Sequence, residues 1–214
     1  MDRDLIATGD EVKDWETLML LYNSALKEIN TKIEILRDEF ENTNHYNPIE
    51  HVTSRLKTAQ SIVRKLKNEG HETDLISMQR YISDIAGVRI VCSFTSDIYK
   101  IADMISSQDD VNVLVIKNYI ASPKPNGYKS YHMIVSIPIF LSDGPRNVKV
   151  EIQIRTIAMD FWATLEHKIH YKFEGNTPEF ITAELTEVAA MINTIDERMQ
   201  ALNETVKSFN ETVN

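Results

Sequence analysis

Residues 148–155 alternate apolar and polar side chains without a break, and this pattern restricts the possible folds more than any other feature of the chain. The alternation predicts a β-strand with one side in a hydrophobic core and a polar row on the other. Residues 130–139 alternate in a similar way, and the turn sequence Ser-Asp-Gly-Pro at 142–145 favours a hairpin between the two segments. The chain should therefore contain a sheet with one polar face, which carries Lys149, Glu151, Gln153 and Arg155.

Apolar residues at three- and four-residue steps predict two long amphipathic helices, at about 14–42 and 179–209. Between them, caps, turn residues and apolar runs predict helices at 58–68, 74–81, 96–106 and 157–172, and strands at 52–57, 86–94 and 111–119. The sequence Asn-Pro-Ile-Glu at 47–50 has the composition of a helix start, and it predicts a short helix or a turn.

The composition is that of an ordinary globular protein, with 43% hydrophobic and 26% charged residues in a chain of 214. This length fits one domain with helical additions. We expect no membrane span, because no apolar run approaches the ~20 residues needed. We expect a cytoplasmic location, because the acidic residues 1–14 lack the features of a signal peptide. The single cysteine, Cys92, lies in an apolar run, which excludes an internal disulfide and favours a buried thiol.

The formal net charge of -9 argues against a protein whose main role is to coat nucleic acid. Residues 51–67 differ from the rest, because they contain no acidic residue. They carry the basic side chains Arg55, Lys57, Arg64, Lys65 and Lys67. The segment indicates either a pocket for a small polyanion, such as a nucleoside triphosphate, or a solvated helix face.

Two further groups of residues could bind a nucleotide. The loop Pro-Lys-Pro-Asn-Gly-Tyr-Lys at 123–129 has the parts to hold phosphates and stack a base, although it could also simply connect two strands. Asp84 precedes the strand with Gly87 and Arg89, and Glu151 lies on another strand. Two such carboxylates could bind Mg²⁺ beside a nucleotide, or Asp84 could satisfy backbone amides at the start of the strand.

Four short runs, in this order, resemble the successive motifs of the RelA/SpoT synthetase domain. They are Asp-Ile-Ala-Gly-Val-Arg at 84–89, Asn-Gly-Tyr-Lys-Ser-Tyr-His at 126–132, Glu-Ile-Gln-Ile-Arg-Thr at 151–156 and Phe-Trp-Ala-Thr-Leu-Glu-His at 161–167. With Arg55, Lys57 and the long terminal helices, the resemblance covers nearly the whole chain. It is greatest to the small alarmone synthetases of the RelP and RelQ type, and RelP is the closer.

The resemblance implies an α+β fold, with a mixed β-sheet related to the nucleotidyltransferase fold between long N- and C-terminal helices. It divides the chain into an N-terminal helix (1–46), a synthetase core (47–175) and a C-terminal oligomerisation helix (176–214), all within one structural domain. It further implies an enzyme that moves the β,γ-pyrophosphate of ATP to the 3′-hydroxyl of GDP or GTP, with Mg²⁺ as cofactor. The products would be ppGpp or pppGpp, and AMP.

The resemblance also assigns roles on the ATP side. Arg55 and Arg89 would clamp the adenine, and Lys57 and Lys65 would hold the phosphates. These residue types suit the roles, because guanidinium groups stack on purine faces and lysine amines neutralise a triphosphate.

The catalytic roles fall to three residues. Asp84 and Glu151 would bind Mg²⁺, and Glu151 would also draw the proton from the attacking hydroxyl. His132 would contact the acceptor's phosphates or the transition state. Arg155 would support Glu151 rather than touch substrate.

The acceptor nucleotide would be bound mainly by the loop at 123–129. Tyr128 would stack on guanine, and Lys124 and Lys129 would contact its phosphates. Gln153 and Asp160 would line the rest of the acceptor pocket.

Two positions depart from the RelQ pattern. RelQ-like members usually have asparagine where this chain has Asp160. They also tend to carry an aromatic residue, associated with an allosteric alarmone site, where this chain has His51, and this difference argues against product activation. The chain lacks the His-Asp pair of the family's hydrolase domain, so we expect synthesis without hydrolysis.

Two other functions use the same fold. A tRNA 3′-end pyrophosphokinase would need a basic surface to hold RNA, and the net charge of -9 argues against it. A non-catalytic nucleotide sensor would not need Asp84 and Glu151, which are both present.

The terminal helices bear on assembly. Each predicted helix spans ~45 Å and carries a continuous apolar stripe, so part of each stripe should need another surface. The two helices could instead pair within one chain. The resemblance favours contacts between subunits and a homotetramer.

Overall fold

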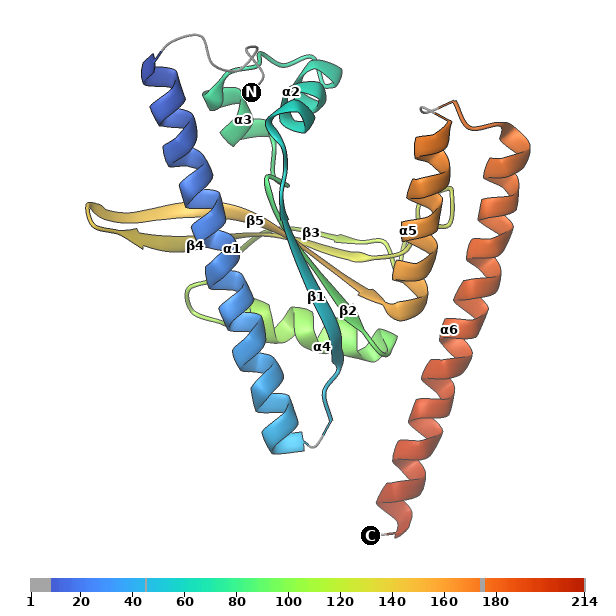
Figure 1. Ribbon diagram of the computed structural model, residues 1–214. Coiled ribbons are helices and arrows are strands. Elements are labelled where there is room, and N and C mark those ends of the chain that lie inside the picture. Colours follow the sequence, from blue (N-terminus) through green and yellow to red (C-terminus); the bar gives the residue numbers. More distant parts are fainter. Residues whose placement is uncertain (1–8, 45, 174–175, 214) are drawn as a thin grey trace.

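The computed structural model describes residues 9–44, 46–173 and 176–213, with a five-stranded mixed sheet at its centre (Figure 1). The strands, in their order across the sheet, are β1 (Ile49–Leu56), β2 (Ala86–Cys92), β5 (Gly144–Thr156), β4 (Tyr131–Leu141) and β3 (Asn112–Asn118). The central strands β2 and β5 are parallel, and all other neighbours are antiparallel. The predicted hairpin is formed by β4 and β5.

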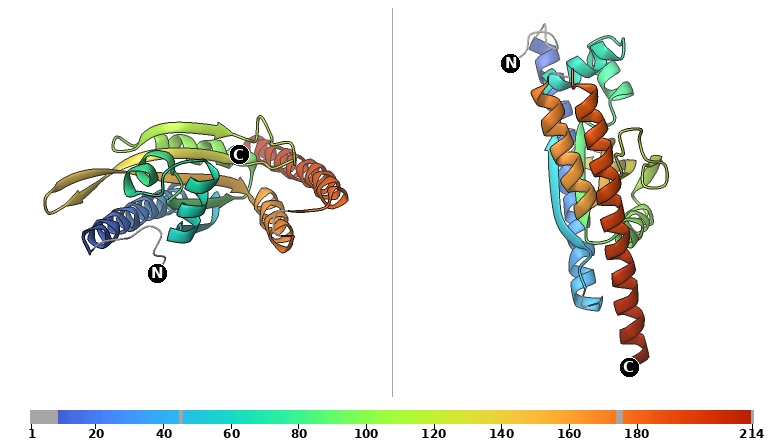
Figure 2. Two further views of the ribbon diagram at one scale, coloured as in Figure 1. Left: turned by 90° about the horizontal axis from the view of Figure 1, so that it is seen from above. Right: turned by 90° about the vertical axis from the view of Figure 1, so that its right-hand side faces the viewer.

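Helices surround this sheet on several sides. They are α1 (Gly9–Asn44), α2 (Ala59–Asn68), α3 (Leu75–Tyr81), α4 (Thr95–Ser106), α5 (Ile157–Lys172) and α6 (Glu179–Val213). Three of them begin where the sequence predicts, because Thr58, Asp74 and Thr156 each accept a hydrogen bond from a backbone N–H of the first turn. The views in Figure 2 show α5 and α6 side by side at one end of the molecule, away from α1.

One face of the sheet forms the hydrophobic core with α1 and α4. On β5, Val150, Ile152 and Ile154 are fully buried and belong to the same core cluster as the buried residues of both helices. Their alternation leaves the intervening polar residues on the opposite face, as predicted. Cys92 is also buried in this cluster, and burial raises the pKa of its thiol.

The strand register sets the polar face in two rows. Arg89 on β2 pairs with Gln153 on β5, which pairs in turn with His132 on β4. In the next row Glu151 pairs with Gly87, and Gly87 pairs with Arg55 on β1. Residues that lie 21 to 64 positions apart in the sequence are thereby paired with one another.

Of the two alternatives predicted for 47–50, the short helix is wrong, because β1 already begins at Ile49, and the turn is confirmed. Ile49 is buried and pairs with Cys92 of β2, so its backbone belongs to the sheet. The side chain of Asn47 accepts a hydrogen bond from the N–H of Ile49. Asn47 thus forms a local turn and does not cap a helix.

The two terminal helices differ in how their apolar stripes are covered. Leu18, Leu26 and Ile29 of α1 are buried against the sheet, so this stripe needs no other surface, contrary to the prediction. Helix α6 packs on α5 only along part of its length and extends beyond the body of the molecule (Figure 1). Its outer part exposes Ile195, Met199, Leu202, Val206 and Phe209. In the part of the chain that the structure describes, α6 packs on α5 and α4 rather than on α1.

Among the described helices, none combines the length and apolar character that a membrane-crossing segment needs.

Candidate active site

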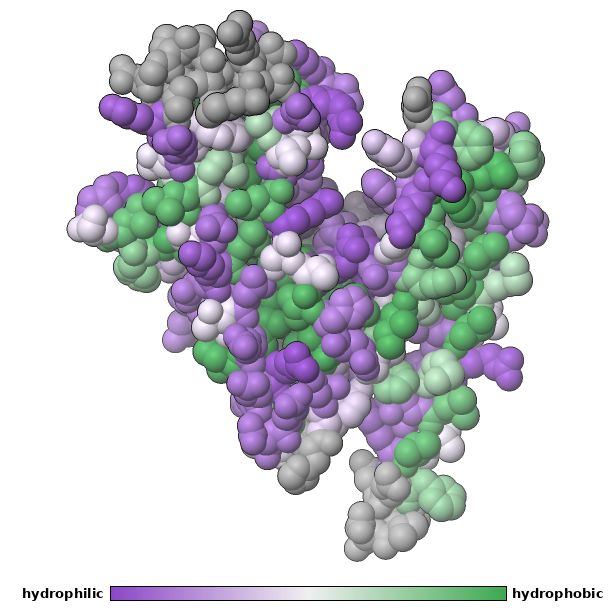
Figure 3. Space-filling view, viewed as in Figure 1, coloured by the Kyte–Doolittle hydropathy of each residue, from purple (hydrophilic) through white to green (hydrophobic). Residues whose placement is uncertain are grey.

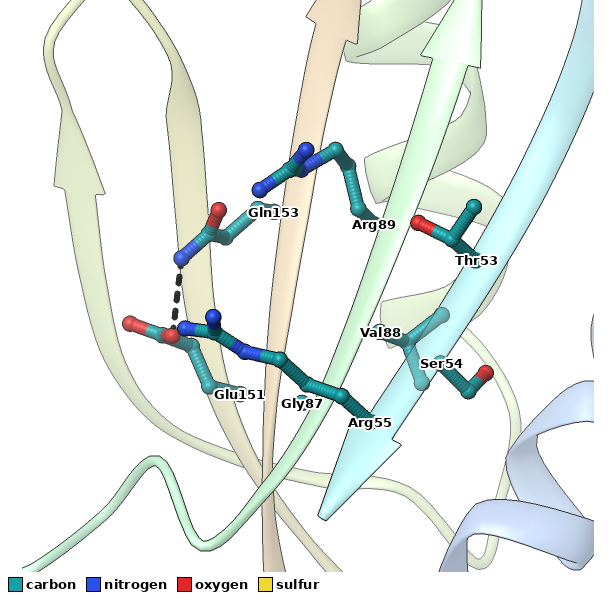
Figure 4. Close-up of a pocket in the computed structure, with 8 residues that line it drawn as sticks. All are labelled: Thr53, Ser54, Arg55, Gly87, Val88, Arg89, Glu151 and Gln153. Carbon is teal, nitrogen blue, oxygen red and sulfur yellow. Dashed lines mark hydrogen bonds between the residues drawn. The ribbon is translucent and has the colours of Figure 1, made fainter. Parts of the chain in front are cut away.

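A pocket of about 280 Å³ opens on the polar face of the sheet. It is lined by Thr53, Ser54, Arg55, Gly87, Val88, Arg89, Glu151 and Gln153. Figure 3 shows a hollow with hydrophilic residues between the body of the molecule and the arm formed by α5 and α6. In Figure 4, Arg55 and Arg89 extend from β1 and β2 toward Glu151 and Gln153 on β5. The structure thus brings four of the predicted site residues to one cavity.

Asp84 lies just before β2 and holds two of the predicted phosphate-binding lysines. The Nζ atom of Lys65 lies 2.9 Å from its Oδ1, and the Nζ atom of Lys57 donates a hydrogen bond to its Oδ2. Burial alone would raise the pKa of the Asp84 carboxyl, but the hydrogen bonds and charges of the two lysines outweigh it and hold this pKa below its usual value. Asp84 is therefore ionised at neutral pH and flanked by two cations.

Glu151 has a partner on each carboxylate oxygen. Gln153 Nε2 donates to Oε2 at 2.8 Å, and His132 Nδ1 lies 3.5 Å from Oε1. Burial favours the protonated form, but the hydrogen bonds from His132 and Gln153 outweigh it and keep the pKa of Glu151 below its usual value. The carboxylate is thus ionised, oriented and partly withdrawn from water.

Arg155 is the most connected side chain of the site, and the sequence predicted for it only a supporting role to Glu151. It is buried, and its donors reach Ser130, Asp160, Tyr128 and Gln153 at 3.3, 3.2, 2.7 and 3.0 Å. Asp160 also lies 3.3 Å from Arg89, so one carboxylate links two arginines.

Three aromatic rings cluster at the edge of the polar row. Tyr128 and Tyr119 contact each other edge to face, and both contact the ring of His132 in the same way. The Nζ atom of Lys124 lies 4.9 Å from the centre of each tyrosine ring. Sequence analysis missed Tyr119, whose only signal was an aromatic residue at the end of a strand that leads into the loop. Lys124 and Tyr128 lie together, as predicted for residues that bind one ligand.

Residues 54–176 match the family described as "Region found in RelA / SpoT proteins". The chain belongs to the RelA/SpoT family. It is 45% identical over 195 residues to GTP pyrophosphokinase YwaC of Bacillus subtilis, an alignment that covers 91% of this chain and 93% of that protein. The synthetase interpretation of the sequence motifs is thereby confirmed.

Solved structures of small alarmone synthetases from Bacillus subtilis share the fold. Synthetase 2 is 45% identical, with a TM-score of 0.82 over 90% of this chain and 99% of that one. Synthetase 1 bound to its product pppGpp is 37% identical, with a TM-score of 0.84 over 91% and 98% of the two chains. The same enzyme bound to AMPCPP is 35% identical, with a TM-score of 0.79 over 92% and 99%.

In this member of the RelA/SpoT family, the loop at 123–129 is fixed to the helical arm. The N–H of Gly127 donates to the carbonyl of Lys124, closing a turn with Pro125 at its second position. Asn126 Nδ2 donates to Glu166 on α5 at 3.0 Å. Gly127 has a φ of +83°, and a Cβ at this position would lie 2.5 Å from the Cβ of Ala189 on α6. Only glycine fits between loop and helix here.

The structure does not bring Lys129 to the pocket. Its Nζ atom lies 4.0 Å from Glu197, and the side chain lies along the groove between the loop and α6. The loop reverses direction at Gly127, which places Lys129 on the side of the helical arm. The predicted contact of Lys129 with acceptor phosphates is therefore not supported by its position.

The described residues include no cluster of three or more carboxylate, histidine or cysteine side chains that could hold a metal ion alone. They do include two ionised carboxylates, Asp84 and Glu151, which lie close enough for the charge of Asp84 to raise the pKa of Glu151. Mg²⁺ is commonly bound by one or two carboxylates, with substrate phosphates and water as the other ligands. The pair fits an ion that arrives with a nucleotide.

Proposed function

We propose that this protein is a GTP pyrophosphokinase that transfers the β,γ-pyrophosphate of ATP to the 3′-hydroxyl of GDP or GTP. The observation that carries the proposal is the position of Glu151, an ionised carboxylate in a pocket lined by Arg55 and Arg89 and linked through His132 to Tyr128. The named activity of the Bacillus relative supports it. The products are ppGpp or pppGpp, and AMP.

Arg55 and Arg89 form the adenine site. Both guanidinium groups reach into the pocket, and the buried Nε atom of Arg89 has no hydrogen-bond partner among the described residues. Planar cations with spare donors suit the face and edge of a purine. Their spacing on neighbouring strands is fixed by the sheet rather than by a loop.

Lys57 and Lys65 bind the phosphates of ATP. Asp84 holds both amines through charge-assisted hydrogen bonds. The phosphates of ATP would form bonds of the same kind, so they compete with Asp84 for the two lysines. Phosphates that take over the lysines leave Asp84 free to join Glu151 in holding Mg²⁺. When bound, this ion neutralises charge on the transferring phosphates.

The reaction follows from the position of the base. Glu151 accepts the proton of the 3′-hydroxyl while the oxygen of this hydroxyl bonds to the β-phosphorus of ATP. The bond between this phosphorus and the oxygen that bridges to the α-phosphorus breaks, and AMP leaves with that oxygen. Lys57 and Lys65 stay on the phosphates throughout.

The acceptor nucleotide binds on the Tyr128 side of the pocket. Guanine stacks on the Tyr128 ring, and Lys124, which sits against that ring, moves to the acceptor's phosphates. Gln153 and Asp160 close this side, although each is also held by Arg155. Lys129 is left out of the acceptor site.

We also propose that the protein is a cytoplasmic homotetramer. The apolar side chains exposed along the outer part of α6 need a partner surface, and a second copy of the same chain supplies one in a closed symmetric assembly. Ile192, in contrast, packs within the chain beside Trp162, so it does not report on assembly.

The decisive experiment uses purified protein, Mg²⁺ and ATP labelled on the γ-phosphate, with either GDP or uncharged tRNA as acceptor. Label in ppGpp with an equal amount of AMP is the expected result. Label on tRNA would show a tRNA pyrophosphokinase instead, and label that stays in ATP with both acceptors would leave a nucleotide-binding protein without this activity.

A further inference from the structure

Five side chains of the site form a closed circuit of polar contacts. From Glu151 one arm runs through Gln153 to Arg155, with distances of 2.8 and 3.0 Å. The other arm runs through His132 and Tyr128 to the same guanidinium nitrogen, with distances of 3.5, 2.8 and 2.7 Å. Each arm ends on a different oxygen of Glu151.

The two ends of the circuit set the direction of the hydrogen bonds, because a guanidinium only donates and an ionised carboxylate only accepts. Arg155 donates to the hydroxyl oxygen of Tyr128, and the carboxylate of Glu151 faces Nδ1 of His132, which leaves Nε2 to accept the hydroxyl proton of Tyr128. A neutral imidazole that accepts at Nε2 carries its proton on Nδ1, which is the nitrogen that faces Glu151. The other arm obeys the same logic, since the amide oxygen of Gln153 faces Arg155 and its nitrogen faces Glu151.

Arg155 itself has no freedom to turn. Its side chain is buried, Ser130 accepts from its Nε atom, and Asp160 neutralises its charge. Asp160 lies in the first turn of α5, which begins directly after β5, so the anchor of the circuit rests on backbone of regular structure.

We propose that the hydroxyl of Tyr128 and the guanidinium of Arg155 are positioning groups that set the tautomer of His132 and thereby aim the carboxylate of Glu151 at the acceptor hydroxyl. This inference rests on the proposed function, and it gives Tyr128 two separable roles. Its ring stacks on guanine, and its hydroxyl connects that stack to the base. The residue that stacks on the acceptor's guanine is therefore linked directly to the groups that position the base.

Tyr128→Phe separates the two roles, because it keeps the ring and removes the hydroxyl. We expect KM for GDP to stay within about threefold of the wild-type value and kcat to fall by about 10- to 100-fold, the loss typical of a small misplacement of a catalytic group. Tyr128→Ala loses the ring as well, so it should raise KM for GDP in addition. A wild-type kcat in Tyr128→Phe, or a rise in its KM equal to that of Tyr128→Ala, would overturn the proposal.

Tyr131→Phe is the matched control. Tyr131 is the neighbour of His132 on β4, but its ring lies on the other face of the sheet against Tyr99. Loss of this hydroxyl should leave both kinetic constants unchanged. The melting temperatures of all variants show whether any loss reflects the fold rather than the circuit.

A second measurement does not depend on activity, so it distinguishes failure of this inference from failure of the proposed function. Side-chain ¹⁵N NMR of the wild-type protein, assigned by the signal lost in His132→Gln, should show the neutral ring of His132 protonated at Nδ1. In Tyr128→Phe a share of the ring should move to the Nε2-protonated form. A wild-type ring protonated at Nε2, or one that Tyr128→Phe leaves unchanged, would refute the circuit even in an inactive protein.

Discussion

Replacement of Gly127 by alanine tests the contact that holds the loop at 123–129 against α6. The added Cβ would lie 2.5 Å from the Cβ of Ala189, and it would sit on backbone with a φ of +83°. The left-handed conformation costs a non-glycine residue about 1–2 kcal/mol. Overpacking against a buried neighbour costs a further ~1–3 kcal/mol, so Gly127→Ala should destabilise the protein by about 2–5 kcal/mol.

A second substitution separates the two costs. Ala189→Gly removes the clashing Cβ, and the next atoms that the new Cβ would meet, Ala189 Cα and Thr186 O, lie at 3.9 Å, an ordinary contact. Ala189→Gly alone costs up to ~1 kcal/mol of helix stability. The double variant should therefore be more stable than the sum of the two single effects by about 1–3 kcal/mol, which leaves the backbone cost at 127 and the helix cost at 189.

Urea unfolding of the four proteins measures this coupling energy, and KM for GDP and ATP in each shows its effect on the site. Because Tyr128 follows Gly127 directly, Gly127→Ala should raise KM for GDP more than KM for ATP, and Ala189→Gly should partly restore it. Coupling within ~0.5 kcal/mol of zero, the range of independent sites, would refute the contact between loop and helix.

Two further predictions concern α6. The carboxylate of Asp196 accepts a hydrogen bond from Thr156, and burial raises the pKa of this carboxyl group. The folded state therefore binds the proton of Asp196 more tightly than the unfolded state does. The stability of the fold consequently falls as the pH rises from the ordinary pKa of the group through the raised one. Asp196→Asn should thus raise the melting temperature at pH 7, and the gain should shrink toward pH 4; an equal gain at both values would contradict this cause. Ile195 is 58% exposed, so Ile195→Glu should leave the fold of one chain intact and split the assembly in light scattering, and an unchanged mass would count against α6 as the contact surface.

The sequence was most informative where structure depends on local periodicity. The alternation at 148–155 places Glu151 and Gln153 on one side of a strand whatever its neighbours are, and the structure confirms that polar face. The starts of α2, α3 and α5 were also predicted to within one residue, and in the structure Thr58, Asp74 and Thr156 cap them by satisfying N–H groups of the first turn.

Features that depend on pairing between residues distant in the sequence could not be predicted from local patterns. An Asn-Pro pair suits both a helix cap and a turn, and only the pairing of Ile49 with Cys92 selects the strand. The circuit around Arg155 depends on the register that puts His132 beside Gln153, which no local pattern encodes. Lys129 lies beside Glu197 of α6 rather than at the pocket, and no local pattern in the sequence predicts this contact.

The most direct test of the account is the rate at which Glu151→Gln moves labelled pyrophosphate from ATP to GDP. The amide can neither accept the proton nor anchor the metal. It also leaves one of the two donors, Gln153 Nε2 or His132 Nδ1, without an acceptor, which costs roughly 1–3 kcal/mol of stability without loss of the fold. With wild-type protein forming ppGpp and AMP in equal amounts, we expect the folded variant to form none. A folded variant that keeps more than about a few per cent of the wild-type rate would contradict the assignment of Glu151 as the base, since general-base catalysis contributes about 10²–10⁴-fold.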